Sequence, residues 1–354
     1  MSSLAVLADT NLLDLSWSRT LSGTVTDLAW SADAASLLAG CGDGSLQRIS
    51  NDGAALTSWQ GHAAGVTRLQ PRPGSDRCLA SAGEDGRVVL WDSAGGVAQA
   101  VLAEQGGRVE QLAWSRDGRL LAAAASKSIS LWHGEQSLGI WYDSCRRILN
   151  MAWALDGERL AAATDKGLYL WRCDGSDLIK LHSLPGAATM VAWQPHGQTL
   201  AAGTQDGFLQ VWHLQADDNG QAEPLTLRSH PGSVARLAWH PARPLLATAA
   251  GPELMLWDLP PAGSAAGRSL RQHRRPITAM AWSPDGRCLA SADQAGRLCL
   301  WDSRGALLSN QQLDDAITTL AWRPSGLSLA IGDSSGGCSC YAINQPTQLN
   351  PDIA

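Results

Sequence analysis

The tripeptide Leu-Ala-Trp recurs along the chain at a nearly constant spacing, and this repeat constrains the fold more than any other feature. It ends at Trp30, Trp114, Trp239 and Trp322, and close variants end at Trp153, Trp193 and Trp282. Pro71 takes the same position in one further copy. The successive spacings are 41, 43, 39, 40, 46, 43 and 40 residues. The chain therefore contains eight copies of a unit of about 41 residues.

Each copy has the pattern of a small antiparallel sheet. An alternating strand such as 277–282 leads into a turn (283–286) whose Pro, Asp and Gly favour turn dihedral angles. A strand of small residues such as 288–291 follows, and a second turn such as 85–86 leads to a third strand ending in Trp. A fourth, less regular strand leads into the next unit. No segment has an apolar period of 3.6 residues, so we expect an all-β protein.

Several third strands end in the dipeptide Trp-Asp, at Trp91-Asp92, Trp257-Asp258 and Trp301-Asp302. Four short strands per unit together with this ending resemble the repeats of WD40 proteins, and the resemblance covers almost the whole chain. It implies one closed β-propeller domain over residues 1–354, built from four-stranded blades. The expected repeat cores are 25–50, 66–92, 109–133, 148–172, 189–213, 234–258, 277–302 and 317–342.

The number of units predicts eight blades, with the segment before Val25 supplying the outer strand of the last blade. Such closure removes an open sheet edge. The alternative is seven blades with one decorative copy. The first and eighth copies are the candidates for that copy, because Ile49 and Tyr341 replace the Trp of their third strands.

The resemblance implies a structural hydrogen-bonded tetrad within a blade, formed by His, Ser or Thr, Asp and Trp. In the second copy the matching residues are His62, Ser81, Asp85 and Trp91. The sixth copy has three of these groups, but no Asp follows them (His230, Thr248 and Trp257). The seventh copy also has three of them, and Ala295 stands where the Asp is expected (His273, Ser291 and Trp301). We therefore expect one complete tetrad. The Trp of the Leu-Ala-Trp phrase is expected to pack between blades rather than to stack on bases or sugars.

Charged residues gather in the loops between blades, which the resemblance places at one end of the propeller, where partners of WD40 proteins typically bind. The candidate partner-binding residues are Arg108, Arg146, Arg147, Arg274, Arg275, Asp314 and Asp315. The competing interpretation is that Arg274 and Arg275 simply pair with Asp314 and Asp315 across neighbouring blades, at little energetic benefit.

Two short motifs suggest chemistry but fit the repeat better as structure. Residues 332–336 match the nucleophile pattern G-x-S-x-G, yet they fall on a turn between strands rather than on a strand-to-helix elbow. Cys338 and Cys340 share one strand face, but they align with the core-facing Val88 and Leu90 and are expected to be buried. We predict no catalytic residue, no metal ligand and no cofactor.

Composition narrows the remaining function classes. The net charge of −6 disfavours nucleic-acid binding, and no apolar run is long enough for a membrane helix. The scattered cysteines, without a CxxC pair, are expected to be free thiols, and we expect a soluble, cytoplasmic protein. The excess of Arg over Lys and of Trp over Phe is typical of a GC-rich, bacterial genome.

The function favoured by the sequence is a non-enzymatic scaffold that binds a protein or peptide partner on the top rim of the propeller. The alternative is a propeller that uses its central channel for a small molecule or a metal, as an enzyme or a metal-handling protein.

Overall fold

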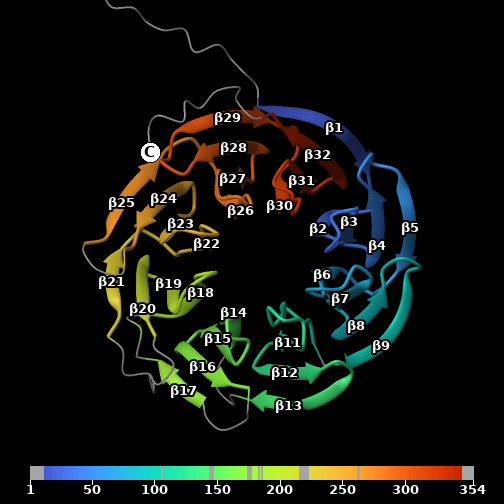
Figure 1. The fold of residues 1–354 in the computed structure, drawn as a ribbon, viewed down its shortest axis with the longest axis horizontal. Coiled ribbons are helices and arrows are strands. Elements are labelled where there is room, and N and C mark those ends of the chain that lie inside the picture. The colour runs from blue at the N-terminus through green and yellow to red at the C-terminus, as the bar shows by residue number, and fades with distance from the viewer. Residues whose placement is uncertain are drawn as a thin grey trace, which may run out of the picture.

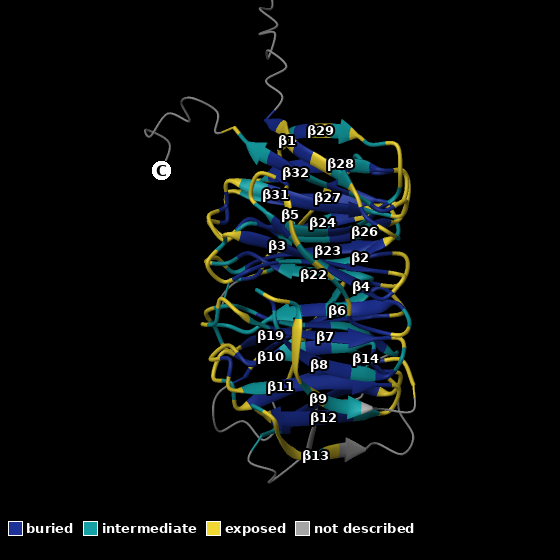
Figure 2. Ribbon diagram, turned by 90° about the vertical axis from the view of Figure 1, so that its right-hand side faces the viewer, coloured by how far each residue is buried: buried dark blue, intermediate teal, exposed yellow. Residues whose placement is uncertain are grey.

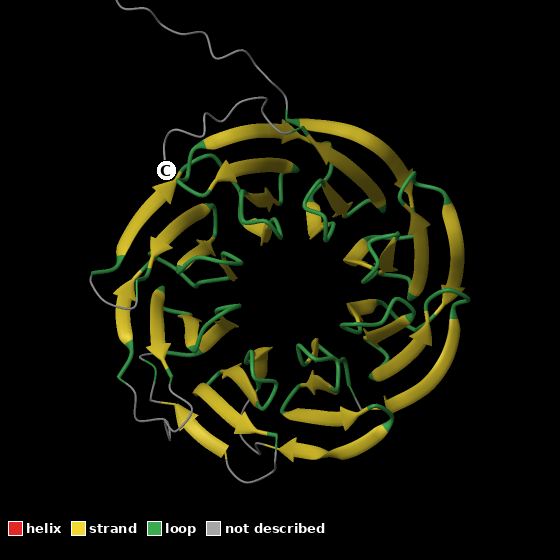
Figure 3. Cartoon of the chain, in the orientation of Figure 1, coloured by secondary structure: helices red, strands yellow, loops and turns green. Residues whose placement is uncertain are grey.

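The computed structural model describes residues 12–104, 107–142, 147–173, 178–181, 184, 186–214, 223–260 and 264–344. These residues form eight four-stranded antiparallel sheets arranged as the blades of a closed ring (Figure 1). The described part of the chain consists of strands, turns and loops and contains no helix (Figure 3). The predicted eight-bladed, all-β propeller is confirmed, and the seven-bladed alternative is wrong.

The first four blades follow the chain, each running from an inner to an outer strand. Blade 1 contains β2 (Val25–Trp30), β3 (Ser36–Cys41), β4 (Ser45–Ser50) and β5 (Ala55–Gln60). Blade 2 contains β6 (Val66–Pro71), β7 (Cys78–Gly83), β8 (Arg87–Asp92) and β9 (Val97–Glu104). Blade 3 contains β10 (Gln111–Trp114), β11 (Leu120–Ala125), β12 (Ser128–His133) and β13 (Gln136–Tyr142). Blade 4 contains β14 (Ile148–Trp153), β15 (Arg159–Thr164), β16 (Gly167–Arg172) and β17 (Leu178–Leu181).

The next three blades repeat this order, and the last one takes a strand from the other end of the chain. Blade 5 contains β18 (Ala188–Trp193), β19 (Thr199–Thr204), β20 (Phe208–His213) and β21 (Leu225–Arg228). Blade 6 contains β22 (Arg236–Trp239), β23 (Leu245–Ala250), β24 (Glu253–Asp258) and β25 (Ala266–Leu270). Blade 7 contains β26 (Ile277–Trp282), β27 (Cys288–Asp293), β28 (Arg297–Asp302) and β29 (Leu307–Gln312). Blade 8 contains β30 (Ile317–Trp322), β31 (Ser328–Asp333), β32 (Gly337–Ile343) and β1 (Leu13–Thr20).

Blade 8 closes the ring by combining the two ends of the described chain. The outer strand β1 pairs antiparallel with β32, from Leu13 opposite Ile343 to Thr20 opposite Gly337. The N–H of Leu21 then donates to the carbonyl of Gly336 at 2.8 Å. The predicted closure by the N-terminal segment is therefore confirmed, and β32 has a partner on both sides.

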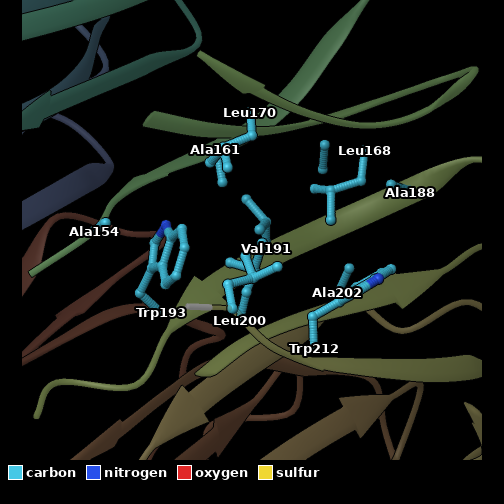
Figure 4. Packing of buried hydrophobic residues seen from close by; sticks show 12 residues of the cluster. Ala154, Ala161, Leu168, Leu170, Ala188, Val191, Trp193, Leu200, Ala202 and Trp212 are labelled. Carbon is cyan, nitrogen blue, oxygen red and sulfur yellow. The ribbon is translucent and has the colours of Figure 1, made fainter. Parts of the chain in front are cut away.

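The apolar core is divided among the contacts between neighbouring blades. Eight buried clusters of the described residues each combine side chains from two adjacent blades, so the cores form a ring like the blades. Figure 4 shows the cluster between blades 4 and 5, where Trp193 and Val191 pack near Leu170 and Leu168. In the side view the buried strands lie between two ends that carry exposed turns (Figure 2).

The Trp that ends most inner strands ties each blade to the one before it. Its indole N–H donates, at 3.0–3.1 Å, to the carbonyl of the residue that precedes the same position in the preceding blade. These pairs are Trp30 with Ala321, Trp114 with Gln70, Trp153 with Ala113, Trp239 with Ala192, Trp282 with Ala238 and Trp322 with Ala281. Trp193 is buried as well, but its N–H has no partner. The predicted packing between blades is confirmed.

Each blade is an antiparallel meander, so its connections alternate between the two ends of the ring. We call the top end the one that carries the turns between second and third strands and the loops from each outer strand to the next blade. The bottom end carries the other two sets of turns.

Candidate functional site

Four of the candidate partner-binding residues lie at the top end, in the loops that enter the neighbouring blades 7 and 8. Arg274 and Arg275 lie in the loop between β25 and β26, and Asp314 and Asp315 lie in the loop between β29 and β30. All four are exposed. The ion pairs among the described residues include none of them. The structure therefore does not contain the mutual pairing that the competing interpretation of these charges predicts.

Two further candidates are already engaged by glutamates of neighbouring loops. A guanidinium nitrogen of Arg108 lies 2.9 Å from Oε1 of Glu84, and both side chains are about half exposed. Arg147 forms an ion pair with Glu110, which raises the pKa of the arginine. Exposed pairs of this kind add little stability, but they occupy the charges that a partner would use. Arg146 lies outside the described residues.

The structure separates the described candidates into two groups on opposite sides of the ring. Arg108 and Arg147 belong to blades 3 and 4, whereas the other four residues belong to blades 7 and 8. Blades that are four apart in an eight-bladed ring face each other across the axis, as Figure 1 shows. The candidates thus form two separate surfaces of the top end rather than one.

The tetrad predicted in blade 2 is present. Nδ1 of His62 lies 2.9 Å from Oδ1 of Asp85, and its Nε2 lies 2.7 Å from Oγ of Ser81. The indole N–H of Trp91 donates to the same Ser81 hydroxyl at 2.7 Å. Burial lowers the pKa of His62 more than the Asp85 carboxylate raises it, so the imidazole is held in its neutral form.

The expectation that blade 7 lacks a complete tetrad is wrong. Nδ1 of His273 lies 2.8 Å from Oδ2 of Asp293, and its Nε2 lies 2.7 Å from Oγ of Ser291. The N–H of Trp301 donates to this serine at 2.8 Å. The carboxylate comes from Asp293, two residues before Ala295. The resemblance to WD40 repeats implies an Asp at the position of Ala295.

The two blades supply the carboxylate from different backbone positions. Asp293 takes the place that Gly83 has in blade 2, where a Cβ would collide with His62 and with the Asp85 carboxylate. In blade 7 the small Ala295 leaves that space to the Asp293 side chain. The signal missed in the sequence was an Asp at the Gly position of the turn, paired with a small residue two positions later.

Blade 6 has three of the four groups, as the sequence predicted. Nε2 of His230 lies 2.8 Å from Oγ1 of Thr248, which also accepts the Trp257 N–H at 3.1 Å. Nδ1 of His230 is buried without a hydrogen bond, and the nearest carboxylate oxygen, from Glu253, is 3.6 Å away. Burial lowers the pKa of His230. All three arrangements are internal to a blade and act as structure.

The described residues contain no group of three His, Cys, Asp or Glu side chains arranged to hold a metal ion. Cys338 and Cys340 are buried in the core between blades 8 and 1, as predicted. Burial raises the pKa of Cys338 to about 12 and that of Cys340 to about 11. Both thiols therefore act as small apolar groups. Residues 332–336 span the end of β31 and the turn to β32, which confirms the strand-to-strand setting of the nucleophile-like motif.

A cavity of about 450 Å³ opens at the bottom end between blades 3 and 4. Its lining alternates acidic and basic side chains, with Asp117, Arg119 and Glu158 among them. Nε of Arg159 donates to Asp156 at 2.8 Å, and this guanidinium also lies over the Trp193 ring at 5.3 Å. The mixed charges favour no single class of ligand.

Comparison with known proteins agrees with this geometry. The family model described as "WD domain, G-beta repeat" matches residues 16–47, 53–92, 97–133, 179–213, 223–258 and 266–302, more than half of the chain. The chain belongs to the WD40-repeat family. Blade 4 and the three strands β30, β31 and β32 of blade 8 lie largely outside the matched ranges, although they have the same strand order as the other blades.

Curated relatives are similar in sequence to this WD40 chain over part of its length. Telomerase protein component 1 of Mus musculus is 28% identical over 251 residues, 66% of this chain and 9% of its own length. Gem-associated protein 5 of Homo sapiens is 26% identical over 337 residues, 83% of this chain and 20% of its own length. Coronin-7 of Bos taurus is 33% identical over 128 residues, 34% of this chain and 14% of its own length. The chain thus spans a fifth or less of these much longer proteins.

Solved structures show the same WD40 fold. The C-terminal WD40 domain of Sif2 superimposes with a TM-score of 0.79 at 18% identity, over 95% of this chain and 99% of that domain. The computationally designed protein Ika8 gives a TM-score of 0.78 at 21% identity, over 92% of this chain and 98% of that chain.

The relatives named above are eukaryotic. The bacterial origin suggested by the excess of Arg over Lys and of Trp over Phe therefore stays a prediction. Among the described residues of this WD40 chain, none belongs to a helix long and apolar enough to span a bilayer.

Proposed function

We propose that this WD40 propeller is a non-enzymatic scaffold whose top end, at blades 7 and 8, binds a protein or peptide partner. One observation carries the proposal. Arg274 and Arg275 are exposed in the loop that enters blade 7, Asp314 and Asp315 are exposed in the loop that enters blade 8, and none of the four takes part in an ion pair with a described residue. Charges held apart on rigid neighbouring loops favour a partner of complementary charge pattern.

The opposite side of the top end is a weaker candidate. A partner that binds Arg108 or Arg147 has to replace Glu84 or Glu110, and this exchange of one ion pair for another gains little. At blades 7 and 8 no such exchange is needed. The expected partner surface places acidic groups opposite the two arginines and basic groups opposite the two aspartates.

The names of the relatives also support a scaffold. They include a "component" and an "associated protein", words that describe members of assemblies. The proposal extends only this general role to the present chain, because the chain spans a small share of those proteins. It also includes a cytoplasmic location, a protein or peptide partner rather than nucleic acid or membrane, and no cofactor.

The proposal is tested by affinity capture from native cytosol, with quantification of bound proteins by mass spectrometry. The test variants are Arg274→Glu with Arg275→Glu, and Asp314→Lys with Asp315→Lys. The matched control is Arg287→Glu with Arg304→Glu, which makes the same charge change as the first variant on two exposed arginines of the bottom end of blade 7.

We expect a partner that is retained by the wild type and the control and is lost by both test variants, while all four proteins unfold at the same temperature. A partner that all four proteins retain equally would contradict the assignment to this surface. If only the control loses the partner, the binding surface lies at the bottom end.

A further inference from the structure

A cavity of about 200 Å³ opens at the bottom end of the ring, where the inner strands of blades 3, 4 and 5 end. These strands, β10, β14 and β18, are neighbours around the axis (Figure 1). Their last residues, Trp114, Trp153 and Trp193, all line the cavity, which we call the tryptophan cavity. No described residue lines both this cavity and the larger one between blades 3 and 4.

A small residue after an inner strand leaves this space open. In blade 2 the residue directly after the inner strand is Arg72, whose guanidinium lies 5.4 Å from the centre of the Trp114 ring in blade 3. In blade 4 the same position is held by the buried Ala154, whose side chain is a single methyl group. Arg159 covers the Trp193 ring at 5.3 Å instead, from the far end of the turn. Ala154 itself lines the cavity, so the space that a long side chain would fill stays empty.

The contact between blades 4 and 5 also lacks a hydrogen bond that the neighbouring contacts have. Trp114 and Trp153 each donate an indole N–H to the preceding blade at 3.0 Å. The Trp193 side chain is buried, with the residue 8% exposed (Figure 4), but its N–H has no partner among the described residues. No hydrogen bond therefore fixes this wall of the cavity to blade 4, and a small rotation of the ring breaks none.

One cation lies at the cavity without a counter-charge. Arg116 of blade 3 lines the cavity, and its Nη1 donates to the carbonyl of Pro195 in blade 5 at 2.7 Å, so the side chain passes the bottom end of blade 4. Arg116 is exposed and belongs to none of the ion pairs among the described residues. The described lining residues include no Asp or Glu. The guanidinium keeps further N–H groups for an acidic ligand.

The acidic residues of the adjoining turns are engaged elsewhere. Asp156 accepts a hydrogen bond from Nε of Arg159 at 2.8 Å. Asp117 accepts one from the hydroxyl of Ser115 at 2.6 Å. Neither carboxylate forms an ion pair with Arg116 in the described part of the chain. The cavity therefore favours a ligand that brings its own negative charge.

The volume of the cavity decides what size of group fits. Sites for free small molecules usually measure about 300–1,000 Å³. An apolar cavity of about 150 Å³ is enough to hold a benzene ring. The tryptophan cavity thus has room for one aromatic ring rather than for a whole ligand. Leu155, which is 41% exposed, extends the apolar lining toward solvent, where the rest of a larger partner would lie.

We propose that the tryptophan cavity binds an acidic peptide segment of a partner protein, with a phenylalanine ring in the cavity and a neighbouring carboxylate paired with Arg116. Aromatic rings attract one another in edge-to-face and offset arrangements, and a single aromatic anchor in a pocket often dominates the binding energy of an interface. A carboxylate is the side-chain group that matches a guanidinium in charge and geometry. This site lies at the bottom end of blades 3 to 5, so it is independent of the surface proposed above for the top end of blades 7 and 8.

The experiment titrates the full chain with a capped pentapeptide that carries a phenylalanine between two glutamates. The indole N–H signals in proton–nitrogen NMR spectra report binding, and the variants Trp153→Phe and Trp193→Phe assign the two signals of interest. Three further peptides replace the phenylalanine with alanine, the phenylalanine with proline, or both glutamates with lysine. Benzoate is titrated in parallel as a free small molecule with the same ring and charge.

Two variants of the site are compared with two matched controls. Arg116→Gln removes the cation, and its control Arg304→Gln removes another exposed arginine of the bottom end. Leu155→Asp adds a negative charge at the cavity. Its control Leu327→Asp makes the same change in the corresponding turn of blade 8, where the leucine is 51% exposed. All four changes are at exposed positions, and unfolding temperatures verify that each protein is folded.

We expect the phenylalanine–glutamate peptide to bind wild type and both controls with a Kd of about 1 mM or lower and to shift the signals of Trp153 and Trp193. The alanine and lysine peptides, and the variants Arg116→Gln and Leu155→Asp, are expected to give binding about tenfold weaker or worse.

Four results would overturn the proposal. The first is the absence of saturable shifts with the phenylalanine–glutamate peptide. The second is equal binding of the lysine peptide, which would remove the role of Arg116. The third is tighter binding of the proline peptide or of benzoate, which would assign the cavity to a different occupant. The fourth is an equal loss in Leu327→Asp and Leu155→Asp, which would show that the effect does not come from the cavity.

Discussion

Asp293 occupies in blade 7 the backbone position that Gly83 occupies in blade 2, and its carboxylate still reaches Nδ1 of a buried histidine at 2.8 Å. In blade 2 the carboxylate that reaches Nδ1 of His62 comes from Asp85, two residues after Gly83. The same buried hydrogen bond is thus built from two positions of the same turn. The neighbour must be small in each case, Gly83 beside Asp85 and Ala295 beside Asp293.

Because the carboxylate can come from either position, we predict that a second substitution restores stability lost by the first. Asp293→Ala leaves Nδ1 of the buried His273 without its partner and is expected to lower the free energy of unfolding by about 2 kcal/mol. The double change Asp293→Gly with Ala295→Asp recreates the arrangement of blade 2 and is expected to recover at least half of the loss. Urea unfolding curves of the three proteins test this. Equal stability of the single and the double variant would show that the two positions are not interchangeable.

The hydrogen bonds between blades predict a difference between two similar tryptophans. Trp30 and Trp193 are both buried and both lie under an arginine, at 5.6 Å from Arg323 and 5.3 Å from Arg159. Trp30 donates to Ala321, whereas the Trp193 N–H has no partner. Trp30→Phe is therefore expected to lower the free energy of unfolding by about 1 kcal/mol more than Trp193→Phe does, because one hydrogen bond contributes about this much. Equal losses in chemical denaturation would show that the bond across the closure contributes nothing.

The buried histidines predict loss of stability in mild acid. Burial lowers the pKa of His62, His230, His240 and His273 below the value of about 6.5 that the unfolded chain has. Between the lowered and the ordinary pKa the unfolded chain binds more protons, so the free energy of unfolding falls as the pH drops below about 6.5.

Urea unfolding at a series of pH values from about 8 to about 5.5 measures this slope. The variant with His62→Gln and His273→Gln is expected to show roughly half of this pH dependence of the free energy of unfolding, because two of the four buried histidines are removed. A stability that stays constant or rises over this range would contradict the neutral state of the imidazoles.

The core cysteines are expected to be inert in the native protein. Burial raises the pKa of Cys299 and Cys338 to about 12 and that of Cys340 to about 11, so almost no thiolate forms at about pH 8. Peptide-level mass spectrometry after iodoacetamide treatment should find them unmodified until urea unfolds the chain. Rapid modification of Cys338 or Cys340 in the native state would contradict their place in the core.

Most of the fold could be predicted from the sequence because each blade repeats the same local pattern. The spacing of the Leu-Ala-Trp phrases gave the number of units, and the segment before Val25 supplied the closing strand, since an outer strand was otherwise lacking. Alternating apolar residues and turn residues act over a few positions, so they can be read without knowledge of distant contacts.

The site was harder to predict because its residues come together only in the closed ring. The top-end charges were found from their loops, but their division between blades 3–4 and blades 7–8 depends on the order of blades around the axis.

Hydrogen–deuterium exchange of the wild-type protein with and without its captured partner tests the central claim most directly. The account predicts slower exchange in the partner complex at residues 271–276 and 313–316, the top-end loops of blades 7 and 8, and unchanged exchange at the bottom turns 283–287 and 303–306. Protection of the bottom turns alone, or of the loops that carry Arg108 and Arg147, would contradict it.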